Sequence, residues 1–277
     1  MAPLIWAHRG ASARCPENTL SAFRAALDLG ADGVELDVHP TADGKVVVLH
    51  DATLERTTDQ RGPVSGKTWP ELQACDAGAW FSPQFKGEKL PLLEEVLHLT
   101  TSCGKKLLIE LKGPPSLSRA VLFLANRLGH LPPAYPQLPK LLATLLKPYN
   151  SQVKSGLILA QSFYQPYLEE LRVLMPELQL LSLAFAPSQG WLQREDLDLR
   201  FGAAVWHRAL RLDLVARLRS GGALPVFAWT VDSDVGISAM LAAGVDGIIT
   251  NRPDRALALA TGDVTLRRGC CRRAKRA

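Results

Sequence analysis

The chain has no apolar run long enough to cross a membrane and no G-x-G-x-x-G turn before its first predicted helix. It also has no C-x-x-C pair and no histidine at zinc-finger spacing. These absences argue against a membrane span, a dinucleotide site and a structural zinc site. The number of cysteines is odd, and none is in a C-x-x-C pattern, so we expect free thiols in a reducing compartment. His8 interrupts the first apolar run before a signal peptide could form, which favours the cytoplasm. The cysteines number five: Cys15, Cys75, Cys103, Cys270 and Cys271.

Positive charge is unevenly distributed along the chain. The formal net charge is +5, and six basic residues lie in the stretch 267–277, so the rest of the chain is close to neutral. We interpret residues 261–277 as a basic, disordered tail that is not a nucleic-acid interface. We therefore expect a small-molecule partner and no nucleic acid, and the sequence indicates no particular oligomeric state.

Short runs rich in Val, Ile and Leu alternate with amphipathic stretches, which is typical of parallel strands covered by helices. Helices are expected near residues 17–29, 167–174 and 234–244, and the length of 277 residues fits an α/β TIM barrel. Nine runs are candidates for the eight strands of such a barrel, and the strand assignment is weakest for 180–185 and 203–206. An open doubly wound sheet is the alternative, although the nucleotide-binding turn is missing. The runs are 4–8, 33–38, 45–50, 106–111, 156–162, 180–185, 203–206, 225–230 and 246–250.

The alternating pattern fails between about residues 52 and 105, which carry turns and an aromatic group near "GAWFSPQF". We expect a small insertion there, after the third strand, lying over the barrel mouth, within a single barrel domain of residues 1–260. A second long connection, 113–150, is expected to hold two helices separated by "LPPAYPQLP".

Acidic residues occur at the ends of two of the predicted strands. Residues two apart in a strand face the same side, so Glu35 and Asp37 point together to the barrel mouth, where Glu110 joins them. Three carboxylates repel one another unless a cation lies among them, and an all-oxygen site suits one divalent cation, Mg²⁺ or Ca²⁺. The alternative is a structural network of ion pairs with Arg9 and Lys112.

Two histidines lie at the ends of the first and third runs. His8 and His50 offer an acid and a base that titrate near neutral pH, as displacement of an alkoxide from phosphorus requires. Arg9 can hold a phosphate through two hydrogen bonds, and Lys112 can neutralise a nonbridging oxygen. The pattern favours metal-assisted phosphoryl transfer.

The motifs "HRG", "PENT", "ELD", "LHD", "IELK", "QSF", "WTVD" and "GIITNRPD" follow one another from Leu4 to Asp254. In this order they resemble the glycerophosphodiester phosphodiesterase family, and "DAGAWFSPQFKGEKLPLLEEV" resembles the insertion of its bacterial cytosolic members. The resemblance implies a TIM barrel with a small inserted subdomain and hydrolysis of glycerophosphodiesters to sn-glycerol 3-phosphate and an alcohol.

The resemblance also assigns roles to individual residues. It places the metal on Glu35, Asp37 and Glu110, proton transfer on His8 and His50, and the phosphate on Arg9 and Lys112. It further implies that Trp229 lies against the glycerol end of the substrate, although a tryptophan there could equally belong to the core. These eight residues form the expected site.

The chain departs from the family pattern at two positions. It has Asp232 where many relatives have Asn, and Asn251 where many have Asp; we expect both to line the rim and retune the glycerol pocket. Two other functions stay open at this point. One is a phospholipase D-like lyase that forms a cyclic phosphate, and the other is a catalytically silent binding barrel.

Overall fold

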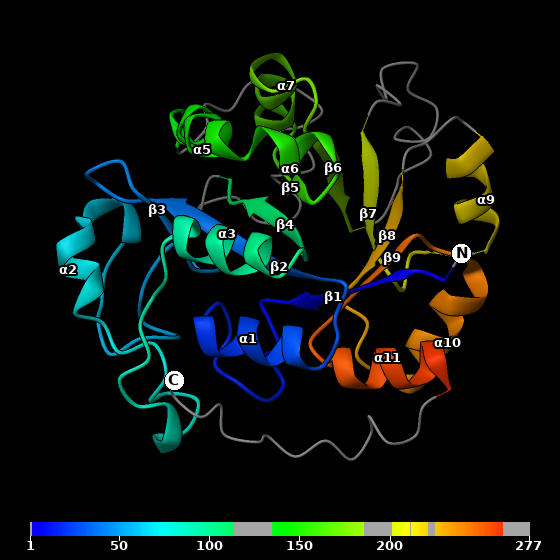
Figure 1. Ribbon diagram of the computed structural model, residues 1–277, viewed down its shortest axis with the longest axis horizontal. Helices are drawn as coiled ribbons and strands as arrows, with labels where there is room; N and C mark the ends of the chain where they lie inside the picture. Colours follow the sequence, from blue (N-terminus) through cyan, green and yellow to red (C-terminus); the bar gives the residue numbers. More distant parts are fainter. Residues whose placement is uncertain (1, 114–134, 186–200, 211, 221–224, 263–277) are drawn as a thin grey trace.

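Eight parallel strands close into a barrel in the computed structural model, which describes residues 2–113, 135–185, 201–210, 212–220 and 225–262 (Figure 1). Parallel pairing of the last strand with the first completes the ring, and the expected TIM barrel is confirmed. The two least secure runs are both barrel strands. In order around the barrel the strands are β1 (Leu4–His8), β2 (Gly33–Pro40), β4 (Lys106–Leu111), β5 (Ile158–Ser162), β6 (Gln179–Ala184), β7 (Gly202–Trp206), β8 (Val226–Trp229) and β9 (Gly247–Thr250).

The third apolar run is the one that stands outside the barrel. β3 (Val46–Val48) pairs antiparallel with the end of β2, with Val38 opposite Val48. The link from β2 to β3 spans only residues 41–45, which is too short for the crossover that parallel pairing needs. The expectation that this run is a barrel strand is therefore wrong, and β2 pairs directly with β4.

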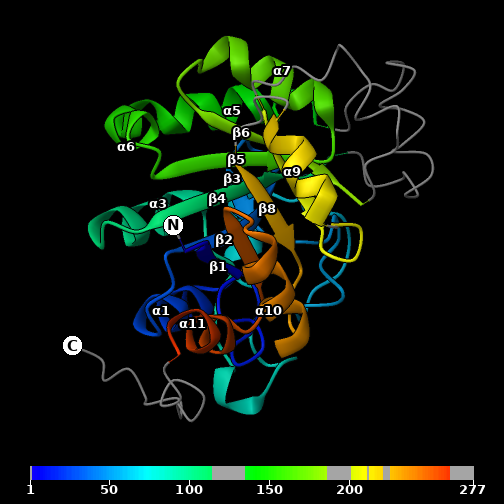
Figure 2. The same cartoon turned by 90° about the vertical axis from the view of Figure 1, so that its right-hand side faces the viewer.

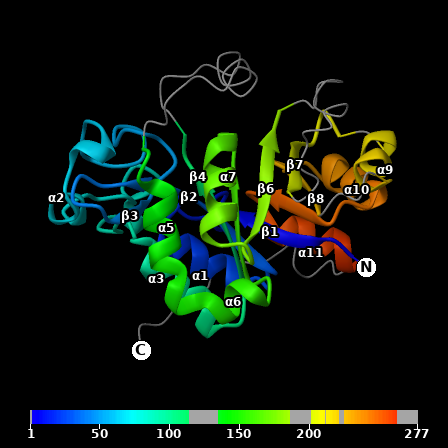
Figure 3. The same ribbon diagram turned by 90° about the horizontal axis from the view of Figure 1, so that it is seen from above.

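Helices cover the outside of the barrel. Figure 2 shows α5 and α7 on one side of the strands and α1 and α11 on the other, and Figure 3 shows α9 and α10 at the end away from α2. None of the described helices combines the length and the apolar character that crossing a bilayer requires. The covering helices are α1 (Leu20–Asp28), α3 (Leu93–Ser102), α5 (Leu138–Leu146), α6 (Asn150–Lys154), α7 (Gln165–Leu174), α9 (Leu212–Ser220), α10 (Asp234–Ala243) and α11 (Pro253–Thr261).

Two expectations fall partly outside the described residues. In the second long connection, α5 is the later of the two expected helices, followed by a short 3₁₀ turn, η3 (Lys147–Tyr149), and residues 114–134 lie outside the described part. The same holds for residues 263–277 of the expected tail.

The segment after β3 builds its own small hydrophobic cluster beside the barrel. It holds two 3₁₀ turns, η1 (Val64–Gly66) and η2 (Pro83–Phe85), and the short helix α2 (Trp69–Gln73), seen at the left of Figure 1. The buried residues of this cluster run from Val47 to Leu90. By contrast, α3 packs into the main core of the barrel.

Apolar side chains fill the inside of the barrel below its mouth. Trp6 and Phe227 meet there with their ring centroids 5.5 Å apart, within a cluster of leucines and Ile249. A Cβ on Gly33 would lie 2.7 Å from the ring of Trp6, so glycine leaves room for this side chain. Trp6 and His8 point to the same side of β1, and the polar site therefore rests on an apolar floor.

Candidate active site

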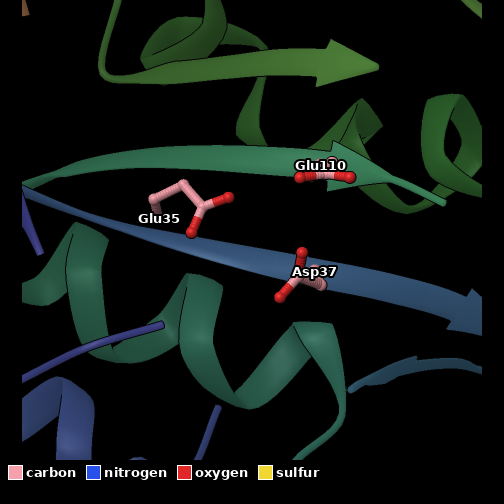
Figure 4. Close-up of side chains that lie close together, drawn as sticks. All are labelled: Glu35, Asp37 and Glu110. Atoms are coloured by element: carbon pink, nitrogen blue, oxygen red, sulfur yellow. The ribbon is translucent and has the colours of Figure 1, made fainter. Parts of the chain in front are cut away.

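Strand register brings three carboxylates together at the barrel mouth. Asp37 of β2 is opposite Glu110 of β4, and Glu35 lies two residues before Asp37 on the same face. Figure 4 shows the three side chains on one side of the two strands. All three residues are buried, and one oxygen from each lies within 4.8 Å of the other two.

Burial and mutual repulsion shift the pKa values of these acids. Burial raises the pKa of Glu35 well above its ordinary value, and the carboxylates of Asp37 and Glu110 raise it further. Burial also raises the pKa of Glu110. On Asp37 burial acts in the same direction, but the charges of Lys112 and Arg9 outweigh it and hold the pKa of that carboxyl well below its usual range.

Lys112 reaches into this cluster from the end of β4. Its Nζ lies 2.8 Å from Asp37 Oδ1 and 2.5 Å from Glu110 Oε1. Burial alone would lower the pKa of Lys112, but the two carboxylates raise it above its ordinary value, so the ammonium stays charged. A cation is thus held beside the three acids, where it can meet a phosphate.

The loop between β1 and α1 supplies Arg9 and Asn18, both of which contact Asp37. Arg9 Nε lies 3.2 Å from Asp37 Oδ2, and Asn18 Nδ2 donates to the same oxygen at 2.8 Å. These are the only non-glycine residues with positive φ among those described, at 55° and 57°. Backbone strain of this kind collects at functional sites. The expected helix at 17–29 begins only at Leu20, because the side chain of Thr19 caps it, which leaves Asn18 free to face Asp37.

His8 is placed at the end of β1 with its ring between Glu35 and the last strand. Its Nε2 lies 4.0 Å from Glu35 Oε2, and its Nδ1 is 2.7 Å from Asn251 Oδ1. Burial, together with the nearby charge of Arg9, lowers the pKa of His8 to about 4. The ring is therefore neutral at pH 7.

His50 reaches the same mouth from outside the barrel, since it follows β3. Its Nδ1 lies 2.5 Å from Asp51 Oδ1, and Arg56 donates to the other oxygen of Asp51 at 2.6 Å. Arg56 also donates to Glu17, which accepts from Arg9 as well. This chain of ion pairs ties the inserted segment to the first loop of the barrel.

Trp229 lies at the end of β8 in an aromatic group. Its ring centroid is 5.5 Å from that of Phe163 and 5.0 Å from that of Phe185. Its indole N–H donates to the backbone oxygen of Ala204 at 2.9 Å, so only the ring is left to meet a substrate.

Three residues that contact the expected site or its neighbours were not predicted from the sequence. Gln161 donates to Glu35 Oε1 at 3.0 Å and is in register with Glu110, so its place at a strand end was the available signal. His39 of β2 donates to the backbone oxygen of His50 at 3.1 Å. Arg56 was not recognised, because its link to the first loop of the barrel depends on Glu17, which is 39 positions away in the sequence.

A cavity of about 450 Å³ opens beside His8. A larger hollow, of about 570 Å³, lies between α5, α6 and the end of α7, and none of the expected site residues lines it. The smaller cavity is therefore the one beside the chemistry. Its lining residues are His8, Arg9, Ser12, Ala13, Glu17, Asp232, Asn251 and Arg252.

The donor set at the carboxylate cluster suits a hard divalent cation. Its ligands are oxygens only, and two of the three acids have raised pKa values, which a divalent charge among them would reverse. The residues present therefore fit a bound metal ion.

Comparison with known proteins agrees with this geometry. The sequence profile of the Glycerophosphoryl diester phosphodiesterase family matches residues 8–255. The chain is 35% identical over 268 residues to a glycerophosphodiester phosphodiesterase of Caldanaerobacter subterraneus subsp. tengcongensis, covering 92% of this chain and 96% of the relative. Identity to one from Bacillus subtilis is 33% over 268 residues, covering 91% and 84% of the two chains.

Solved structures give the same result. An Oleispira antarctica phosphodiesterase, solved with its product sn-glycerol-3-phosphate, is 25% identical, with a TM-score of 0.77 over 94% of this chain and 97% of the other. A glycerophosphodiester phosphodiesterase from Agrobacterium tumefaciens is 27% identical, with a TM-score of 0.71 over 92% and 99%. The family profile matches residues 8–255, and the two relatives align over 96% and 84% of their own lengths. The chain therefore belongs to the glycerophosphodiester phosphodiesterases, the hydrolases that cleave glycerophosphodiesters.

Proposed function

We propose that this enzyme releases sn-glycerol 3-phosphate and an alcohol by a metal-dependent reaction that His8 and His50 catalyse as base and acid. The observation that carries the proposal is the cluster of Glu35, Asp37 and Glu110, flanked by two cations and two histidines in unlike surroundings. The bound product in the Oleispira antarctica structure supports glycerol 3-phosphate as the retained half of the substrate.

Glu35, Asp37 and Glu110 would hold one divalent cation, Mg²⁺ or Ca²⁺. When bound, such an ion supplies Lewis-acid polarisation of a phosphoryl oxygen. Arg9 and Lys112 bind the phosphate. Both already lie beside Asp37, so the acids that hold the metal also orient the two cations that hold the substrate.

The surroundings of the two histidines differ, and the difference supports opposite roles in proton transfer. His8 has only 14% of its side chain exposed, has a neutral amide as its partner, and is unprotonated at pH 7 because its pKa is lowered to about 4. An unprotonated ring can accept a proton from the attacking water. This leaves the acid role to His50, whose ring is one-third exposed and whose Nδ1 is fixed by Asp51, so that Nε2 can deliver a proton to the departing alkoxide.

Trp229 offers an apolar ring to the carbon skeleton of the glycerol. Support comes from its position in the aromatic group with Phe163 and Phe185 at the barrel mouth, while its N–H is already bonded to the backbone. The three described cysteines, Cys15, Cys75 and Cys103, form no disulfide bond, which supports a reducing, cytoplasmic setting.

The test is ³¹P NMR of glycerophosphoethanolamine incubated with the metal-free enzyme, before and after Mg²⁺ or Ca²⁺ is added. We expect no turnover without the ion and glycerol 3-phosphate as the final product with it. Glu110→Gln should abolish turnover, whereas the exposed Glu169→Gln, the same change on α7, should not. Full turnover in excess EDTA would contradict the metal assignment, and a cyclic phosphate as the end product would contradict hydrolysis.

A further inference from the structure

His8 is connected to two side chains that come from the far end of the chain. Asn251 Oδ1 is 2.7 Å from His8 Nδ1 and also accepts from Ser12 Oγ at 2.8 Å. On its other side Asn251 Nδ2 donates to Asp232 Oδ2 at 2.7 Å. Asp232 follows β8 and Asn251 follows β9, so closure of the barrel brings both beside β1.

Asp232 is held independently of His8. Its Oδ1 accepts from the backbone N–H of Asn251 at 2.8 Å and from Thr250 Oγ1 at 3.1 Å. Together with the hydrogen bond from the Asn251 amide to Oδ2, the carboxylate has three donors, which come from the last residue of β9 and the residue after it. The Asp232 carboxylate is therefore a hydrogen-bond acceptor with a fixed position.

The chemistry of these groups sets the direction of every hydrogen bond. An ionised carboxylate only accepts, so the amide of Asn251 must turn its NH₂ toward Asp232. Its carbonyl oxygen then faces His8, and because that oxygen also only accepts, Nδ1 must carry a proton in either charge state of the ring, so a nitrogen without a proton can only be Nε2. The lone pair is thus on Nε2, the nitrogen on the side of Glu35.

We propose that Asp232 and Asn251 act together as positioning residues that hold His8 in its Nδ1–H tautomer, with the Nε2 lone pair facing the phosphate site. The proposal rests on the proposed role of His8 as the base. It gives the two residues a role beyond the expected tuning of the glycerol pocket, since the side chain of Asn251 contacts both Asp232 and His8.

The two side chains can be exchanged without losing a hydrogen bond. In the double variant D232N/N251D, the amide at 232 donates to the carboxylate at 251, whose second oxygen accepts from His8 and Ser12. In D232N alone two amides face each other, so the amide at 251 is free to turn its NH₂ toward His8 and force the other tautomer. In N251D alone two carboxylates meet at about the 2.7 Å separation of the present pair.

The first measurement reads the tautomer directly. ¹⁵N-histidine labelling and two-dimensional ¹H–¹⁵N NMR of the Mg²⁺-loaded enzyme distinguish protonated from unprotonated ring nitrogens, and a His8→Gln variant identifies the His8 signals among those of the six histidines. We expect Nδ1–H and a bare Nε2 in the wild type and in the double variant, and a mixed or reversed pattern in D232N. An Nε2–H ring in the wild type would overturn the proposal without any substitution in the network.

The second measurement is turnover of the same diester. Partners that orient a functional group typically contribute about 10- to 100-fold, so each single variant should lose that much in kcat with little change in KM. The double variant should recover most of it. Asp234→Asn is the matched control, because this neighbouring carboxylate pairs with Arg255 at 2.6 Å outside the network and should leave kcat unchanged.

The two proposals fail in different ways. Full activity in His8→Ala would refute the role of His8 as the base. An inactive His8→Ala beside a fully active D232N would refute the positioning role alone, as would a double variant no better than the single ones.

Discussion

Removal of the leaving-group acid should be visible as a loss that depends on the leaving group. An alkoxide departs only with a proton, so His50→Ala should lower kcat on glycerophosphoethanolamine by about 10²- to 10⁴-fold, which corresponds to roughly 2.7–5.4 kcal/mol. A p-nitrophenyl diester releases a weakly basic phenolate, and on it the variant should recover much of the loss. His8→Ala should lose activity on both diesters, because the attacking water needs its base in either case.

The structure indicates that unfolding will not imitate this result. His50 is one-third exposed, and when its ring is removed Asp51 keeps both of its bonds to Arg56, at 2.6 and 3.1 Å. A partly exposed pair of this kind contributes at most about 1 kcal/mol to stability. The expected loss in kcat corresponds to roughly 2.7–5.4 kcal/mol, which is several times larger than this loss of stability.

The assay compares kcat on the two diesters for both variants and for His98→Ala, an exposed histidine on α3 that should behave as the wild type. Equal losses on both diesters in both variants would refute the division of labour between the histidines. Recovery of kcat on the p-nitrophenyl diester by His8→Ala alone would make His8 the acid and His50 the base.

Two further predictions concern the carboxylates and the first loop. Because burial and its neighbours hold the pKa of Glu35 well above its ordinary value, Glu35→Gln should leave the melting temperature of the metal-free protein unchanged or higher. Mg²⁺ or Ca²⁺ at a hundredfold excess over Kd should stabilise the wild type by about 2.7 kcal/mol and the variant hardly at all, and an equal rise in both would contradict the ligand assignment. Gly10→Ala should destabilise the fold more than Gly30→Ala in urea titrations, since both glycines have positive φ but only at Gly10 would a Cβ lie 2.6 Å from the backbone of Ala22. The Gly30 change has only the left-handed conformation to oppose it, about 1–2 kcal/mol, and similar losses at both sites would show that crowding at Gly10 is unimportant.

The carboxylate cluster was predictable because it depends on two local rules. Side chains alternate along a strand, and parallel strands of a barrel end at one rim, so Glu35, Asp37 and Glu110 had to face the same mouth once the strands were recognised. The direction of the third run was not read correctly, since "KVVVLH" has the composition of a buried parallel strand. The deciding signal was the length of the link, with Gly44 at φ 76° forming the tight turn of a hairpin.

The partners of His8 were beyond the reach of sequence patterns. His8 and Asn251 are 243 positions apart, and only closure of the barrel between β1 and β9 makes them neighbours. Asp232 and Asn251 were expected at the rim, but nothing in the sequence indicated that their side chains pair with each other. Their pairing depends on how the loops after β8 and β9 lie relative to each other, and no local sequence pattern encodes that arrangement.

The hairpin strand β3 has a consequence for cooperativity. Its residues alternate between two cores, with Val46 and Val48 in the barrel core and Val47 in the cluster of the inserted segment, which also contains Leu49. His50 follows this strand, so the histidine proposed as the acid is attached to the segment that lies between the two cores. A partial opening of the inserted segment would withdraw that ring while the barrel stayed intact, and loss of turnover would then report local opening before any global unfolding transition.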